Sequence, residues 1–245
     1  MKIIETSLNL RIEQGKHKED YLISEDIAKK QLSFSDTDIY TNVEFMDCDN
    51  TAYLKMFEDS GYNSFISLDE KGRGILCEIK KEYAVKTIGK MTEPHMLHLR
   101  VEKGDKYIDL ITVRLLVSCG NDADFKDRNK QWNKVLNYIE TLSDKFNLVL
   151  IGDFNHGVIS YDINGYRNRP RQYFNYQMVV KDLKNKNIIL YPMEGNSYRG
   201  YMKIDHVATG EKILVENAVY EDVFGNTEII GIPDHSCIIA NIKCT

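Results

Sequence analysis

The chain of 245 residues contains few prolines and few cysteines. Four prolines leave little material for linkers, and no low-complexity tract or short repeat is present. The five cysteines are odd in number, widely spaced and without a CxxC pair, so neither a disulfide framework nor a zinc site is indicated. We therefore expect a reducing, cytoplasmic location.

Long apolar segments are also missing. The opening MKIIETSLNL is interrupted by Glu5 and Asn9 and is not followed by a small-residue cleavage site, so we expect no secretory signal. No stretch approaches the length of a membrane span, and we expect no membrane association. The net charge of −5 argues against broad attraction to nucleic acid, so polyanion binding would depend on local basic patches.

Short extended runs dominate what is present, and amphipathic segments separate them. The turn KGDK between runs 97–103 and 107–117 predicts an antiparallel hairpin. Helices are expected near 24–32, 50–61, 124–145 and 171–183, and the other extended runs are 2–9, 38–45, 62–67, 74–80, 147–151, 187–191, 203–209, 213–220 and 236–243. The pattern predicts one α/β domain over residues 1–245, in which two packed sheets are covered by helices as a four-layer sandwich.

Polar residues stand at the ends of several of these strands. In NLVLIGDFNHG, an apolar run stops at Asp153 and Asn155. Glu44 lies inside the apolar run DIYTNVEFMD, where an unpaired carboxylate would be costly to bury. Similar positions are occupied by Asn9 in SLNL, Asp205 in KIDHV, and Asp234 and His235 in PDHS.

A group of acids without matching cations repels itself unless a divalent ion or a bound proton offsets the charge. Hard oxygen ligands favour magnesium, manganese or calcium over zinc. An aspartate beside a histidine can supply oriented proton transfer. Each residue alone is more often a turn cap or a satisfied core side chain, but the set together indicates a reaction centre.

In this order, SLNL, NVEF, IGDFN, KIDHV and PDHS resemble the endonuclease/exonuclease/phosphatase superfamily, which includes DNase I and exonuclease III. The resemblance extends from the first strand to the last, and GDFN and the final DH pair are its most specific pieces. It implies the four-layer α/β/β/α sandwich of DNase I and metal-assisted hydrolysis of a phosphoester, with Mg²⁺ as the cofactor and Mn²⁺ as a possible substitute.

The resemblance also implies a role for each matching residue. Glu44 would be the principal metal ligand, with Asn9 and Asp234 close to the metal. Asp153 would orient or deprotonate the attacking water, and Asn155 would hold a phosphate oxygen. The remaining pair is His235, which would stabilise the phosphate or assist proton transfer, and Asp205, which would fix the tautomer of that histidine.

Arg114 departs from the family, whose nucleases commonly present histidine or tyrosine at this position. A guanidinium can clamp a phosphate in a bidentate manner but cannot donate a proton as an imidazolium does. A buried arginine paired with an acid is an equally good interpretation. With either interpretation, Arg114 does not identify the group that would protonate the leaving oxygen, nor the class of substrate.

Basic residues interleave with aromatic ones in YRNRPRQYFNYQ, residues 166–177. Arg167, Arg169 and Arg171 could neutralise the phosphate backbone of a nucleic acid. A basic loop that leads into an amphipathic helix is an equally good interpretation. Tyr198 and its basic neighbours form either a second rim for the substrate or an exposed loop.

These observations predict a magnesium-dependent phosphodiesterase of nucleic acid, most simply a DNA endonuclease. The alternatives are a phosphatase or phosphodiesterase for a small molecule, such as a nucleotide, sugar phosphate or phospholipid head group, and a binding protein with a relic site. The sequence leaves open DNA against RNA, internal against terminal cutting, and the oligomeric state.

Overall fold

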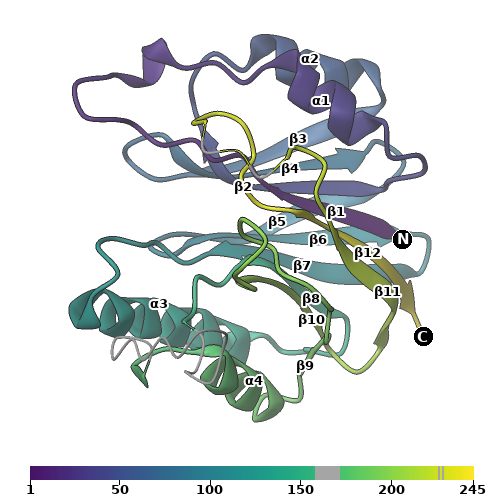
Figure 1. Cartoon of the computed structure of the whole chain (residues 1–245). Helices are drawn as coiled ribbons and strands as arrows, with labels where there is room; N and C mark the ends of the chain where they lie inside the picture. Colours follow the sequence, from purple (N-terminus) through teal and green to yellow (C-terminus); the bar gives the residue numbers. More distant parts are fainter. Residues whose placement is uncertain (158–171, 226, 228) are drawn as a thin grey trace.

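A computed structural model describes residues 1–157, 172–225, 227 and 229–245. The chain forms two six-stranded sheets packed face to face (Figure 1). The first has the order β11-β12-β1-β2-β4-β3, formed by Ile213–Glu221, Cys237–Cys244, Lys2–Ser7, Ile39–Met46, Arg73–Lys80 and Tyr62–Leu68. The second has the order β5-β6-β7-β8-β10-β9, formed by Ala84–Thr92, His95–Lys103, Lys106–Arg114, Leu148–Asp153, Asp205–Thr209 and Ile189–Leu190.

Helices cover the outer face of each sheet. Helices α1 (Glu25–Leu32) and α2 (Thr51–Asp59) lie over the first sheet, and α3 (Asp122–Thr141) and α4 (Tyr176–Lys184) lie over the second (Figure 1). A short 3-10 turn, η1, spans Lys18–Asp20. The predicted four-layer α/β sandwich is therefore confirmed. The side chains of Ser24, Asn121 and Asn175 cap the first turns of α1, α3 and α4 by accepting backbone N–H groups.

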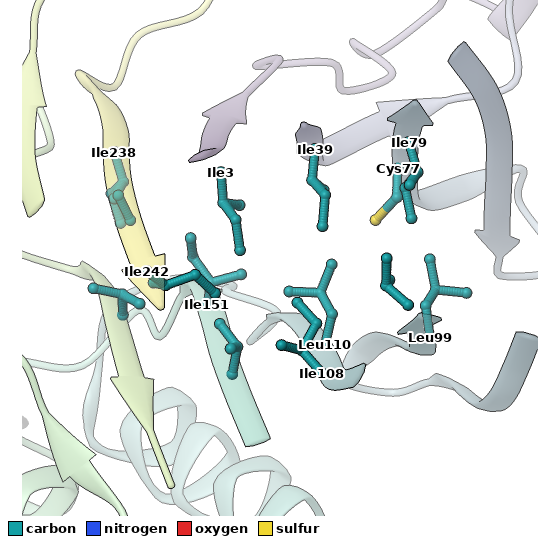
Figure 2. Close-up of a cluster of buried hydrophobic side chains, with 14 of the residues drawn as sticks. Ile3, Ile39, Cys77, Ile79, Leu99, Ile108, Leu110, Ile151, Ile238 and Ile242 are labelled. Carbon is teal, nitrogen blue, oxygen red and sulfur yellow. The ribbon is translucent and has the colours of Figure 1, made fainter. Parts of the chain in front are cut away.

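The space between the sheets is filled by aliphatic side chains. Strand alternation directs Ile3, Ile39, Leu110 and Ile151 into this layer, where they are fully buried (Figure 2). The predicted hairpin is also present, since β6 and β7 pair antiparallel with Lys103 opposite Lys106. Two rigid sheets thus hold the strand ends that carry the polar residues.

The sequence prediction missed strand β5 and placed two helices imprecisely. Strand β5 lies at the edge of its sheet, and most of its side chains are at least partly exposed, so it lacks the apolar run that marks a core strand. Helix α3 ends at Thr141 instead of 145, and α4 begins at Tyr176 instead of 171. None of the helices in the described residues combines the length and the apolar character that crossing a bilayer requires. All five cysteines are free thiols.

Candidate active site

The topology brings the predicted site residues to one end of the two sheets. Strands β7 and β8 run parallel, with Arg114 opposite Asp153, and the antiparallel strand β10 starts with Asp205 opposite Asp153. In the other sheet, β1 and β2 also run parallel, and both end at the same edge, where β12 begins. Glu44, Asn9 and His235 therefore meet the residues of the second sheet.

Three of these residues have left-handed backbone conformations. The φ angles are +51° at Asn9, +54° at Glu44 and +45° at Asn155. Such angles are uncommon outside glycine and cost on the order of 1 kcal/mol each, so the surrounding structure must enforce them. Strained residues of this kind cluster at functional sites, because the strain aims a side chain that regular strand geometry would direct elsewhere.

A β-bulge aims the side chain of Glu44. The register between β2 and β4 shifts between Asn42 and Phe45, so one extra residue stands in β2. The Glu44 carboxylate accepts a hydrogen bond from Ser7 Oγ at 2.9 Å and forms an ion pair with the Arg114 guanidinium. Burial opposes its ionisation, but Arg114, His235 and Ser7 together lower the pKa of Glu44. This partly buried carboxylate is therefore ionised, and the Arg114 guanidinium offsets its charge.

Gly152 allows β8 to approach β7 closely just before Asp153. Its φ is +133°, and a Cβ atom there would lie 2.1 Å from the carbonyl oxygen of Val113. No other residue fits without moving the strand. The glycine of the IGDFN motif thus allows the close packing of β8 on β7 that positions Asp153.

Asp153 is held by the residues that follow it. Its Oδ1 accepts the backbone N–H of Asn155 at 2.9 Å, and the Asn155 amide donates to its Oδ2 and to the carbonyl of Leu115. Burial, and next the neighbouring Asp205, raise the pKa of Asp153 above its ordinary value. An acid with a raised pKa can accept and release a proton near neutral pH.

Asp205 and His235 form a buried pair. Asp205 Oδ2 lies 2.7 Å from His235 Nδ1, and both residues are nearly inaccessible to solvent. Burial alone would favour the neutral imidazole, but Asp205, Asp153 and Glu44 raise the pKa of His235 to about 10. The imidazolium is thus the favoured state, with Nδ1–H donating to Asp205 and Nε2 directed away from it.

Asn9 and Asp234 present oxygen atoms that could bind a cation. The Asn9 amide nitrogen donates to the carbonyl oxygens of Ile229 and Ile232, each at 3.1 Å, which leaves its Oδ1 as an acceptor. Asp234 Oδ1 is buried, accepts no hydrogen bond from the described residues, and lies 3.8 Å from His235 Nε2. With Glu44, these side chains supply oxygen atoms of the kind that Mg²⁺ and Mn²⁺ prefer.

No three His, Cys, Asp or Glu side chains of the described residues converge closely enough to form a metal cluster. The donor set is instead two carboxylates and one amide, and Glu44 is paired with Arg114. The residue types suit the group that the resemblance implies.

A cavity of about 280 Å³ opens over these residues. Its walls include the predicted site residues Asn9, Glu44, Arg114, Asp153, Asn155, Tyr198, Asp234 and His235. The Tyr198 ring packs edge-on against His235, with centroids 4.9 Å apart, and Arg199 Nη2 lies 3.6 Å from Asp234 Oδ2. Tyr198 is thus part of the cavity wall and not an exposed loop residue.

The structure brings together all predicted site residues except three. Arg167, Arg169 and Arg171 lie outside the described residues. The sequence analysis missed Ser7, which contacts Glu44, and Arg128, which lines the cavity and donates to the Asn155 carbonyl at 2.8 Å. Arg128 is paired with Asp124 and stands four residues before the buried Trp132, so its helical spacing was a usable signal.

No known family model matches the chain, and no curated protein sequence does. Solved structures do match. The 3′ phosphatase NExo from Neisseria, bound to a product DNA hairpin, gives a TM-score of 0.66 at 13% identity over 99% of each chain. TDP2 from D. rerio, complexed with a single strand DNA product, gives 0.62 at 15% identity over 99% of this chain and 98% of that one.

An endonuclease/exonuclease/phosphatase from Beutenbergia cavernae gives a TM-score of 0.63 at 12% identity, covering 99% of this chain and 71% of that one. At these identities the likeness establishes the fold. The resemblance to the endonuclease/exonuclease/phosphatase superfamily is therefore confirmed for the architecture: the chain has the DNase I-like fold.

Proposed function

We propose that residues 1–245 form a single-domain, Mg²⁺-dependent phosphodiesterase that cuts nucleic acid, and specifically a DNA endonuclease of the reducing cytoplasm. The observation that carries the proposal is the convergence of Glu44, Asp153 and His235, from distant parts of the sequence, around one cavity. The fold is shared with NExo and TDP2, whose structures were solved with DNA products, and this supports a nucleic-acid substrate.

Glu44, Asn9 and Asp234 are the residues that would hold the cation. When bound, a divalent ion acts as a Lewis acid on the phosphoryl oxygen and stabilises developing negative charge. The ion pair with Arg114 has to loosen as Glu44 takes part, which would free the guanidinium to contact a phosphate oxygen. Arg114 is therefore proposed as a substrate-binding residue.

Asp153 is proposed as the group that orients the attacking water and accepts its proton. Asn155 and the backbone hold its carboxylate, and burial keeps its pKa raised, which suits a base that works near neutral pH. The Asn155 amide remains the proposed contact to a phosphate oxygen. In this structure the Asn155 NH₂ group donates to Asp153 and to the carbonyl of Leu115. A contact with the phosphate would therefore require one of these N–H groups to be shared with a phosphate oxygen.

His235 is proposed to stabilise the phosphate as an imidazolium. Its Nδ1–H is held by Asp205 at 2.7 Å, and the raised pKa keeps the ring charged at neutral pH. The Nε2–H, which lies 3.8 Å from Asp234 Oδ1, can then donate to a phosphoryl oxygen or to the leaving oxygen. Tyr198, packed on the imidazole, limits its rotation and borders the substrate.

The direct test is incubation of the purified protein with Mg²⁺ and a panel of plasmid, linear and single-stranded DNA, RNA and chromogenic phosphodiesters, with a chelator control. We expect nicking of plasmid DNA that stops in the chelator. A His235→Ala protein purified in parallel controls for contaminating nuclease. Cleavage by this variant at the parental rate would rule the proposal out.

A small phosphorylated molecule, such as a nucleotide, sugar phosphate or phospholipid head group, is the second candidate. The cavity of about 280 Å³ and the net charge of −5 favour it. Salt dependence separates the two candidates, because a polyanion releases counterions when it binds. Affinity that falls steeply with added salt supports nucleic acid, and a flat response supports the small ligand.

A further inference from the structure

Glu5 is a buried acid that the proposed mechanism does not use. It lies in the middle of β1, is fully inaccessible to solvent, and neither carboxyl oxygen has a hydrogen-bond partner among the described residues. An ionised carboxylate in such a place is strongly disfavoured, so the group avoids the cost by holding a proton. A protonated carboxyl group in turn has a donor that requires an acceptor.

Strand geometry places Glu5 directly beneath the site. Ile3, on the same face of β1, belongs to the aliphatic layer between the sheets, and Ser7, two residues further on this face, contacts Glu44. Glu5 is paired with Ile238 of β12 and Thr41 of β2, and both also point between the sheets. Glu5 therefore lies between the apolar layer and the cavity residues.

An acceptor without a partner is available on the opposite sheet. Asp205 opens β10 on the inner face that it shares with Val207, and its Oδ2 is taken by His235. Its Oδ1 is buried and has no partner among the described residues. Asp205 is also the charged group that acts most strongly on Glu5, ahead of His235, Asp153 and Glu44. Burial, followed by Asp205, raises the pKa of Glu5 well above its ordinary value.

We propose that Glu5 is a positioning residue whose protonated carboxyl group donates to Asp205 Oδ1, directly or through one internal water. The donated bond fixes the rotation of the Asp205 carboxylate, so that Oδ2 stays in line with His235 Nδ1. One proton thus satisfies two buried groups that would otherwise each lack a partner. The proposal rests on the function proposed above only in that the positioned histidine is the catalytic one.

The test compares Glu5→Gln, which keeps a donor, with Glu5→Leu, which removes it. Glu78→Gln serves as the matched control, because Glu78 is also a fully buried acid on a strand but lies away from the cavity and bonds Ser64. Circular dichroism and melting curves establish that each variant is folded. Glu5→Met, closer in length to glutamate, replaces Glu5→Leu if the latter does not fold.

The first readout is the proton NMR signal of His235 Nδ1–H, assigned by its loss in His235→Ala. We expect it at its parental position in Glu5→Gln and Glu78→Gln, and shifted or lost in Glu5→Leu. The second readout is turnover of a chromogenic phosphodiester. We expect kcat to fall about 10- to 100-fold in Glu5→Leu with KM unchanged, and to be rescued to within about threefold in Glu5→Gln.

A folded Glu5→Leu protein with the parental signal and the parental kcat would overturn the proposal. Equal losses in Glu5→Gln and Glu5→Leu would overturn the donor role as well. If the parental protein hydrolyses no substrate of the panel, the proposed function fails, and the NMR comparison alone decides whether Glu5 holds Asp205.

Discussion

Two buried aspartate–histidine pairs occupy different regions of this molecule. Asp205 and His235 lie at the mouth of the space between the sheets, and the histidine lines a cavity. Asp109 and His98 lie on the outer face of the second sheet, 3.3 Å apart at their closest, where Tyr138 of α3 covers them. The two pairs have the same chemical groups but different surroundings.

The difference lies in how the charge of each aspartate is matched. Asp109 receives two hydrogen bonds of 2.9 Å from Arg100, and His98 Nδ1 bonds the Tyr138 hydroxyl at 2.8 Å. The pair at the cavity instead shares its space with further carboxylates, and Asp205 Oδ1 has no partner among the described residues. The proposed reaction centre is thus distinguished from the outer pair by unmatched charge beside a cavity, and not by the presence of an acid–imidazole pair.

Replacing each histidine by alanine should give the largest contrast. His235→Ala is expected to lower kcat by about 10³-fold, because proton transfer and charge stabilisation are lost together. His98→Ala should keep kcat within about twofold but lower the melting temperature, since Asp109 and Tyr138 lose a buried partner. Rate and melting measurements on both variants check this. Equal activity losses would contradict the assignment of the cavity pair as catalytic.

Glu78 extends the contrast to a buried acid outside the cavity. Burial raises its pKa to about 8. The folded state thus binds the proton of the Glu78 carboxyl group more tightly than the unfolded state does. The resulting contribution to the stability of the fold is complete below about pH 4.5 and is lost as the pH rises through 8. The parental protein should therefore lose stability between pH 5 and pH 9, whereas Glu78→Gln should not. Over this range we expect the unfolding free energy of Glu78→Gln, relative to that of the parental protein, to rise by about 4 kcal/mol. Denaturant unfolding at several pH values measures it, and a constant difference would show that Glu78 ionises normally.

The two arginines offer a smaller contrast. Arg114→Lys keeps the positive charge but loses the planar fork, and we expect KM for a phosphodiester to rise about tenfold. Arg100→Lys should leave KM unchanged, because Arg100 bonds Asp109, stacks on the Tyr107 ring and does not line the cavity. Steady-state kinetics on both proteins provide the measurement. An unchanged KM in Arg114→Lys would indicate that Arg114 serves only as the structural ion-pair partner of Glu44.

The two tyrosines should give the smallest effects. Tyr198→Leu removes the ring that packs on His235, and we expect kcat/KM to fall about fivefold, in keeping with the loss of one aromatic contact. Tyr138→Leu should leave kcat/KM unchanged and act only on stability. A larger kinetic effect of Tyr138→Leu would indicate that the outer pair communicates with the cavity.

The sequence predicted the fold and much of the site because both leave local signals. Asp153 and Asn155 follow an apolar strand directly, and the hairpin 103–106 has turn residues between two alternating runs. Pairings across the sheets leave no such signal. The partners of Glu44, namely Ser7 and Arg114, are 37 and 70 residues away in the sequence.

Glu5 illustrates the same limit. In the sequence it only interrupts an apolar run, and its burial next to Asp205, 200 residues later, depends on how the two sheets pack. Likewise, the left-handed conformation of Glu44 accompanies a bulge in the pairing of β2 with β4. No short sequence pattern within β2 predicts this bulge.

The central claim is that side chains from distant strands converge to bind one hard cation. Isothermal titration of the parental protein with Mg²⁺, beside Glu44→Gln and Asp109→Asn, tests it most directly. We predict one ion bound per chain in the parental protein and in Asp109→Asn, and binding at least tenfold weaker in Glu44→Gln. No measurable Mg²⁺ binding by the parental protein, or equal affinity in Glu44→Gln, would contradict the account.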